Sequence, residues 1–199
     1  ADGPGSVKPV ARQRRVLYNF DGGSCLSTEA QSRGPAEVNA DDVRQLIAEV
    51  ADRLAIEGLR LAGTVQSNYE RPNRKKCDMD LRVLPDGPVV RISEDRGEMA
   101  RGCILDSGAL EQTVHEVERR LDGADILIVN KFGKREAEGK GLAPVIAEAL
   151  HRGLPVLVGV NGLNLAALLS FAEEEIHGLP TNAEAVADWC LAGVVRLPA

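Results

Sequence analysis

The sequence predicts a three-layer α/β fold, in which a mainly parallel sheet carries helices on both faces. Two runs, 125–130 and 155–160, are apolar without polar alternation, which is typical of parallel strands that are covered on both faces. Segments with the apolar spacing of helices alternate with strand-like runs along the chain. We therefore expect strands joined by helical crossovers in a single domain over residues 15–199.

The N-terminal half predicts a strand, a helix and a second strand. Residues 15–20 are an apolar run that enters a turn, and 24–38 are typical of a long polar loop. Apolar residues at helical spacing predict a helix over 41–58, and 59–66 predict the next strand. Residues 69–105 break the alternation, beginning with a basic, polar turn, and predict a hairpin inserted at the edge of the sheet.

The C-terminal half predicts four helices around the two buried strands. Their expected spans are 107–121, 142–151, 165–172 and a last segment through Cys190. Thr181 and Glu184 have the spacing of a capping box, which predicts where the last helix begins. The stretch between 130 and 142 is rich in glycine and charge, and we expect it to form a turn.

The composition argues against several kinds of partner. The 199 residues include 24 Lys and Arg and 30 Asp and Glu, a net charge of −6, which disfavours nucleic acid and anionic membrane surfaces. Aromatic residues make up 3%, too few for a base-stacking surface. Residues 1–14 are typical of a flexible arm rather than a secretory signal, and polar residues interrupt the apolar stretch 154–172. We expect no membrane insertion.

The four cysteines stand at wide, irregular spacings: Cys25, Cys77, Cys103 and Cys190. A chain of this size folds without bridges, so we expect reduced thiols and a cytoplasmic protein. Cys77 and Met79 share one face of a predicted strand and Cys103 follows the hairpin, a set of ligands that suits a soft metal. Cys and Met are also common packing residues, and no Cys-x-x-Cys or His pair completes a zinc-type set. Both interpretations stay open.

Ligands of open α/β sheets bind beyond the carboxyl ends of the strands, a rule that here selects the segments 21–28, 66–78, 130–141 and 161–164. Segment 130–141 carries four cations, two carboxylates and three glycines, and such a set suits an oxyanion. The predicted anion-binding residues are Asn130, Lys131, Gly133, Lys134, Arg135 and Lys140. A solvated, charged turn is the alternative interpretation.

The turn after the first strand lies where a nucleotide-binding α/β protein has its phosphate-binding loop. Ser24, Ser27 and Thr28 offer hydroxyl groups that donate hydrogen bonds to an anion. A P-loop also requires a lysine that neutralises the β- and γ-phosphates, and 21–28 contains none. An ordinary turn explains these residues equally well.

Five segments of the chain together resemble a known pattern: 58–66, 77–81, 101–110, 124–141 and 155–160. The string N-K-F-G-K-R-E-A-E-G-K-G at 130–141 is the most specific part. These segments resemble an uncharacterised bacterial domain family that is often met beside molybdate-transport genes and has no established activity. The resemblance implies a role in molybdenum uptake or cofactor supply, beside a protein partner in a metal-transport or metalloenzyme system.

The layout is also similar to the P-loop nucleoside-triphosphatases related to thermophilic nucleotide phosphatases. In those enzymes a buried strand ends in D-E-x-G-x-x-E, whose first two acids position magnesium and water. Asn130 and Lys131 stand at the acid positions here, whereas Gly133 and Glu136 match. The resemblance implies a P-loop-like fold, and the missing Walker lysine and acid pair imply inefficient hydrolysis.

We therefore expect a P-loop-like accessory protein that binds a small oxyanion such as molybdate, or a nucleotide with Mg, without efficient hydrolysis. A divergent nucleoside-triphosphatase, in which Glu136 or Glu138 activates water, is one alternative. A soft-metal-binding protein that uses Cys77, Met79 and Cys103 is another. A purely structural partner of a metalloenzyme or transporter is the last, and oligomer formation is compatible with every one of these hypotheses.

Overall fold

The computed structural model describes residues 16–21, 40–70, 77–94, 104–172 and 176–194. The strands are β1 (Val16–Asp21), β2 (Leu61–Glu70), β3 (Cys77–Val83), β4 (Val89–Arg91), β5 (Ser93–Glu94), β6 (Ile104–Leu105), β7 (Ile126–Phe132), β8 (Val156–Asn161) and β9 (Ile176–Gly178). The helices are α1 (Ala40–Ile56), α2 (Ser107–Glu118), α3 (Lys134–Ala137), α4 (Ala143–His151), α5 (Gly162–Ala172) and α6 (Ala183–Gly193).

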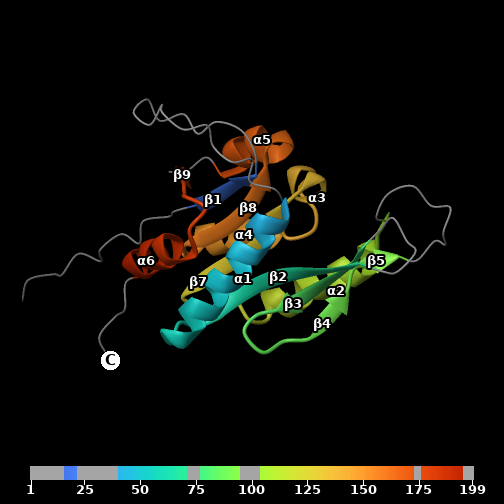
Figure 1. Ribbon diagram of the computed structural model, residues 1–199. Coiled ribbons are helices and arrows are strands. Elements are labelled where there is room, and N and C mark those ends of the chain that lie inside the picture. The colour runs from blue at the N-terminus through green and yellow to red at the C-terminus, as the bar shows by residue number, and fades with distance from the viewer. Residues whose placement is uncertain (1–15, 22–39, 71–76, 95–103, 173–175, 195–199) are drawn as a thin grey trace, which may run out of the picture.

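One seven-stranded sheet organises the fold, in the order β4-β3-β2-β7-β8-β1-β9 (Figure 1). β2, β7, β8, β1 and β9 run parallel to one another, whereas β3 and β4 are antiparallel to their neighbours. β5 and β6 form a separate two-stranded ribbon. The expectation of a mainly parallel sheet is confirmed.

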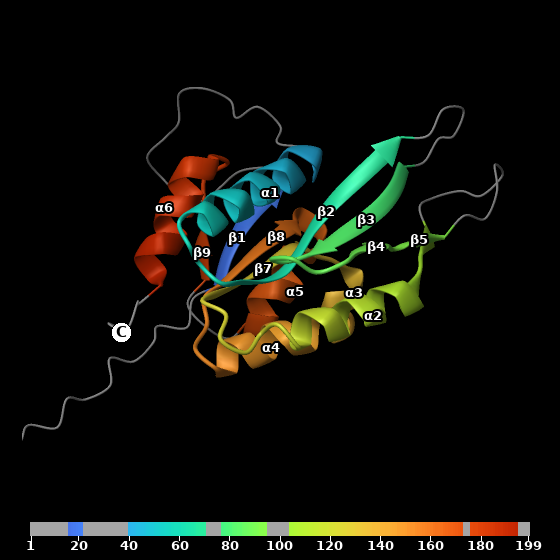
Figure 2. The same ribbon diagram turned by 90° about the horizontal axis from the view of Figure 1, so that it is seen from below.

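Helices cover both faces of the sheet, which gives the three predicted layers (Figure 2). α1 and α6 pack on one face, and α2, α4 and α5 pack on the other. β7 and β8 supply both cores because successive side chains point to opposite faces. Ile128 and Leu157 belong to the core under α1, whereas Val129 and Val158 belong to the core on the opposite side. The two doubly buried strands are therefore confirmed.

The predicted long helices are present, and two of them end just before the expected glycines. Gly58 and Gly153 follow α1 and α4 with φ of +80° and +71°, a conformation that glycine adopts without steric cost. The predicted capping box at the last helix is wrong by one residue. Asn182, a stronger cap than Thr181, accepts a hydrogen bond at its Oδ1 from the Ala185 N–H at 2.8 Å. None of the described helices is long and apolar enough to cross a membrane.

The predicted turn after the strand at 125–130 is wrong over its first half. β7 continues through Phe132, and the single helical turn of α3 follows at once. Phe132 is fully buried and its ring lies 5.7 Å from that of Phe171 on α5, so packing on a distant helix extends the strand. The short edge strand β9, which pairs in parallel with β1, has no counterpart in the sequence pattern.

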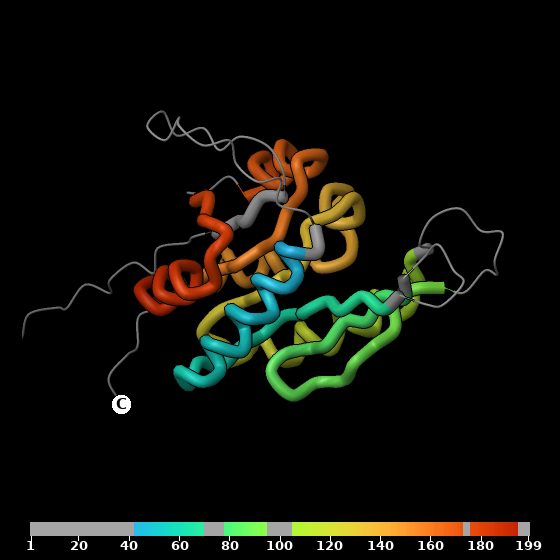
Figure 3. The backbone as a smooth tube through the Cα atoms, in the orientation of Figure 1, coloured from blue at the N-terminus to red at the C-terminus, as the bar shows by residue number. Residues whose placement is uncertain are grey.

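Residues beyond β2 form an antiparallel excursion at one edge of the sheet, as predicted. β3 pairs with β2 and β4 pairs with β3, and together they extend away from the parallel strands (Figure 3). β2 runs to Glu70, so Tyr69 and Glu70 lie in a strand rather than in the predicted turn. β2 thus has a parallel partner on one side and an antiparallel partner on the other.

Candidate functional site

A β-bulge in β7 shapes the carboxyl edge of the sheet. The pairing of β7 with β8 shifts register between Val129 and Phe132, and Asn130 and Lys131 lie within this shift. Lys131 is exposed there, while its neighbours on both sides are buried. Bulges of this kind redirect side chains and are common beside functional sites. Asn130 and Lys131 therefore lie at an irregularity of the backbone.

Two polar groups beneath this edge are buried without a hydrogen-bond partner. Asn130, which is 3% exposed, accepts a hydrogen bond at Oδ1 from the Gln66 N–H at 3.1 Å, but its Nδ2 has no partner. Thr64, 1% exposed on the neighbouring strand β2, likewise has an unpartnered Oγ1. An unsatisfied buried polar group costs about 1–3 kcal/mol. Both atoms are therefore candidates to bind a ligand.

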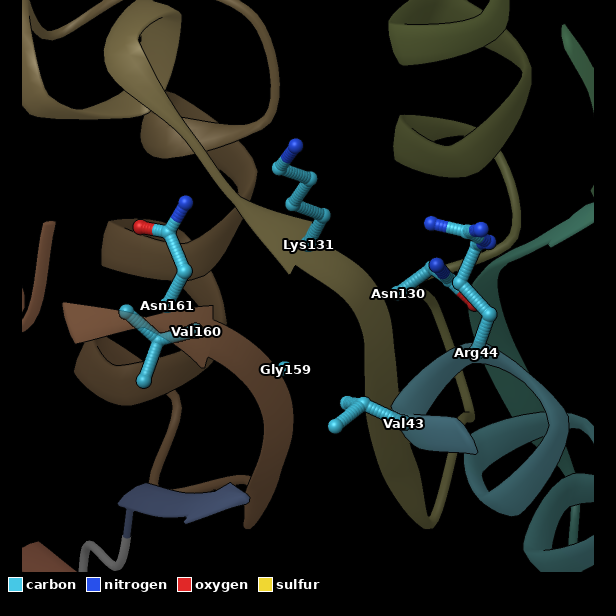
Figure 4. Close-up of a pocket in the computed structure, with 7 residues that line it drawn as sticks. All are labelled: Val43, Arg44, Asn130, Lys131, Gly159, Val160 and Asn161. Atoms are coloured by element: carbon cyan, nitrogen blue, oxygen red, sulfur yellow. The ribbon is translucent and has the colours of Figure 1, made fainter. Parts of the chain in front are cut away.

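A narrow pocket lies between the bulge and the beginning of α1 (Figure 4). Its lining comes from three elements: Val43 and Arg44 of α1, Asn130 and Lys131 of β7, and Gly159, Val160 and Asn161 of β8. The side chains of Arg44, Lys131 and Asn161 point to the same side of the pocket in Figure 4. Two cations from different elements thus flank this end of the sheet.

Gly159 allows the close packing of this pocket. A Cβ at this position would overlap the Asn130 carbonyl oxygen and approach Ile47 Cδ1 of α1 to 2.8 Å. Only a residue without a side chain lets β8, the bulge and α1 approach this closely. Gly159, within the apolar run 155–160, is therefore needed for the geometry of the edge.

A larger hollow of about 440 Å³ opens on the face that α2 covers. Lys131, Lys134 and Arg135 supply cations at the end formed by β7 and α3. Side chains of β3 and α2, among them Met79 and Leu110, supply an apolar end. Lys131 and Asn130 border both this hollow and the pocket at α1, so the bulge lies between the two.

Glu136 is the one carboxylate among the described residues that line the larger hollow. It is 7% exposed, and it accepts hydrogen bonds from the Gly133 N–H at Oε2 (2.9 Å) and from the Leu142 N–H at Oε1 (3.2 Å). A Cβ at Gly141, where φ is +57°, would collide with Oε1. Glu136 therefore ties the end of β7 to the beginning of α4 and fixes the loop between them.

The structure brings most of the predicted residues of this segment together. Asn130, Lys131, Gly133, Lys134, Arg135 and Glu136 all line the larger hollow. Glu138 is exposed and pairs with Lys134 at 3.8 Å between Oε1 and Nζ. Lys140 is exposed and is not part of the lining of either pocket. Ser24, Ser27 and Thr28 lie outside the described residues.

The predictions concern two metal sites, a soft-metal site and a magnesium site. Met79 lines the apolar end of the larger hollow, but Cys103 and the side chain of Cys77 lie outside the described part, so the soft-metal site stays a prediction. No group of three or more His, Cys, Asp or Glu that suits a metal occurs among the residues described. Mg²⁺ prefers oxygen ligands and is often held in part by the phosphates of its substrate. Glu136 accepts one backbone hydrogen bond at each carboxylate oxygen, and a nucleotide with Mg stays a prediction.

Several lining residues escape the sequence reasoning, although the rule on strand ends selects the segments that contain some of them. The residues that the structure adds are Arg44, Thr64, Gln66, Asn161 and Asn164. Asn161 is partly occupied, because its Oδ1 accepts hydrogen bonds from the Asn164 N–H and side chain at 3.2 and 2.6 Å. Arg44 carried one usable signal, since a cation directly after the first turn of a helix opposes the helix dipole.

The layered sheet and its cationic carboxyl edge define a P-loop-like α/β protein. The chain is similar in structure to THEP1 from Aquifex aeolicus, with a TM-score of 0.57 and 13% identity over 92% of this chain and 99% of that one. This likeness confirms the fold. The model of the family described as "Protein of unknown function (DUF2478)" matches residues 36–189, and the chain belongs to that family.

A curated relative also matches most of this chain. It is the molybdenum import ATP-binding protein ModC 2 of Bradyrhizobium diazoefficiens, 33% identical over 175 residues. The match covers 84% of this chain and 20% of that protein, so the chain spans about one fifth of its relative's length. The resemblance to a domain family met beside molybdate transport is thereby confirmed.

Proposed function

We propose that this domain binds a small oxyanion, or the phosphate group of a nucleotide, at the carboxyl edge of its sheet. The observation that carries the proposal is the bulge of β7. It exposes Lys131 between two pockets while the buried Nδ2 of Asn130 lacks an acceptor. An anion seated on Lys131 supplies that acceptor and gains charge-assisted hydrogen bonds.

The charges around this edge favour an anion. Lys134 and Arg135 follow Lys131 on the same rim, and Arg44 flanks it from α1. The chain as a whole carries −6, so a local group of cations attracts an anion against the general field. The amino end of α1 also lies at this edge and adds the positive end of its helix dipole.

The same residues disfavour rapid hydrolysis. A hydrolase positions water with a general base, and the nearest buried carboxylate, Glu136, already accepts two backbone hydrogen bonds. Glu138 is exposed beside Lys134. The domain therefore holds its anion rather than turning it over.

The biological setting of the proposal follows from the relatives. The similarity to a protein named as a molybdenum import ATP-binding protein supports a role in molybdenum uptake or cofactor supply. Molybdate is then the candidate oxyanion, and a transport or metalloenzyme component is the candidate protein partner. We also propose a cytoplasmic location, because we expect the cysteines to be reduced thiols.

Calorimetric titration tests the proposal with molybdate, tungstate, sulfate, ATP and GTP. We expect at least one of them to bind, and Lys131→Ala to weaken it tenfold or more, because a charged hydrogen bond contributes about 1.5–3 kcal/mol. Arg53→Ala is the matched control, since Arg53 pairs with Glu49 on the exposed side of α1. The absence of binding across the whole panel would overturn the proposal. Magnesium-dependent phosphate release from ATP or GTP would instead support the divergent nucleoside-triphosphatase.

A further inference from the structure

The larger hollow has an apolar end that a bare oxyanion does not use. Leu81, Ile92 and Leu110 form a small core cluster of their own, separate from the two main cores. Met79 and Leu105 pack against this cluster and are only partly buried, and both line the hollow. Apolar surface of these two side chains therefore faces the open space beside the cationic rim.

The size of the hollow also exceeds that of a tetrahedral oxyanion. Its volume is about 440 Å³, whereas a water molecule occupies about 30 Å³ of liquid and an oxyanion has only five heavy atoms. Sites for cofactors and other small organic molecules measure about 300–1,000 Å³ and combine apolar walls with a few placed polar groups. The hollow matches such a site in both respects.

Unpartnered polar atoms lie around this one hollow. In the described part of the chain, three buried side-chain atoms lack a hydrogen-bond partner: Thr64 Oγ1, Asn130 Nδ2 and Arg135 Nε. All three residues line the hollow. Thr64 lies on β2, between the cationic end at β7 and the apolar end at β3, so hydrogen-bonding capacity extends into the interior.

We infer that the hollow binds an organic anion, a phosphorylated compound whose uncharged ring system lies against Met79 and Leu105. The inference rests on the proposed function, because Lys131, Lys134 and Arg135 hold the phosphate group in both. Asn130 Nδ2 donates to that same phosphate group, whereas Thr64 hydrogen-bonds to polar atoms between the phosphate and the ring. The ring covers apolar surface that is otherwise exposed to water, which gives ring-bearing ligands the higher affinity.

Titrations with matched phosphates separate the two ends of the site. The probes are inorganic phosphate, ribose 5-phosphate, and four phosphates that carry a heteroaromatic ring system, AMP, GMP, CMP and flavin mononucleotide, which are the ring-bearing compounds of this test. We expect at least one ring-bearing compound to bind tenfold tighter than ribose 5-phosphate, a difference of about 1.4 kcal/mol. Lys131→Ala should weaken every phosphate that binds.

Substitutions at the apolar end locate the ring. Leu105→Glu and, separately, Met79→Glu should reduce the affinity for the preferred compound to that for ribose 5-phosphate and leave the latter within threefold of wild type. Ile56→Glu is the control, because Ile56 is 83% exposed at the far end of α1. Circular dichroism and thermal unfolding confirm that each variant folds, and the second variant replaces the first if one does not.

The outcomes distinguish this inference from the proposed function. If all four ring-bearing compounds bind within threefold of ribose 5-phosphate, the ring site is wrong while the anion site stands. If the ring preference survives in both glutamate variants, the ring binds elsewhere and the inference is again wrong. If neither inorganic phosphate nor any organic phosphate binds, and the oxyanions named earlier do not bind either, the anion site itself is overturned.

Discussion

The Asn130 side chain continues the ladder between β7 and β2 beyond its last backbone pair. Paired residues of these parallel strands end at Thr64 and Val129, and the next bridge is the hydrogen bond from the Gln66 N–H to Asn130 Oδ1 at 3.1 Å. The side-chain amide thus replaces a backbone carbonyl at the bulge. Its other end, Nδ2, is buried without a hydrogen-bond partner.

Asn130→Ala should lower the free energy of unfolding by about 1–3 kcal/mol, because the half-buried Gln66 N–H loses its acceptor. Urea denaturation measures the effect. Asn130→Asp keeps an acceptor but replaces the Nδ2 donor by a negatively charged oxygen, so it should abolish anion binding. An Asp variant that binds the preferred anion as tightly as wild type would contradict the assigned role of Nδ2.

Glu136→Gln should destabilise the fold by about 1–3 kcal/mol, because an amide oxygen replaces only one of two acceptors and its NH₂ then faces a backbone N–H. Glu138→Gln is the matched control and should change stability by less than about 0.5 kcal/mol, since Glu138 is exposed. Chemical denaturation of both variants gives the comparison. A Glu136→Gln variant of wild-type stability that has lost a phosphatase activity would favour a catalytic role instead.

Gly159→Ala should destabilise the protein by about 1–3 kcal/mol or more, because the added methyl group overlaps the Asn130 carbonyl and crowds Ile47. The same variant should weaken anion binding, since it pushes the bulge away from β8. Gly193→Ala is the control: the nearest atom to its Cβ is Trp189 Cζ3 at 3.8 Å, an ordinary contact at the end of α6. Equal effects of the two substitutions would disprove the close approach described at Gly159.

Cys190 should make the stability of the domain fall at alkaline pH. The side chain is 0% exposed, and burial raises the pKa of its thiol from about 9 to about 12. Between these values the unfolded chain loses the proton while the native thiol keeps it, so rising pH favours unfolding by up to about 1.4 kcal/mol per pH unit. Below pH 9 the contribution is fully present. The free energy of unfolding, measured by denaturation from pH 8 to 10.5, should fall more steeply with pH in wild type than in Cys190→Ala. The same pH dependence in both proteins would contradict the prediction.

The fold follows closely from local sequence, because its signals lie within single elements. The uninterrupted apolar run Ile126–Val129 identifies a doubly buried strand, and the spacing from Val43 to Leu54 identifies α1. The bulge of β7 has no such local signal. It depends on Phe132 packing against Phe171, nearly forty residues away, and on the absence of a side chain at Gly159.

Some residues of the candidate site can likewise be predicted from the sequence, and others cannot. The cationic residues Lys131, Lys134 and Arg135 are recognisable because they follow a buried strand. Thr64 is not, since a threonine in a strand is ordinary and only the assembled sheet shows that its hydroxyl group is buried without a partner. The sequence offers Glu136 as a residue that activates water, whereas the structure shows it accepting hydrogen bonds from the backbone N–H groups of Gly133 and Leu142, on either side of it.

The two ends of the larger hollow come from different parts of the chain. β7 and α3 belong to the parallel core of the fold, whereas β3 and Ile92 belong to the antiparallel excursion at its edge and β6 belongs to the separate two-stranded ribbon. On the proposed binding mode, mutations in the excursion should alter which molecule fits and leave the cations of the rim in place. Relatives that share the N-K-F-G-K-R-E string but differ between residues 77 and 105 should accordingly diverge in ligand choice while keeping a common electrostatic anchor.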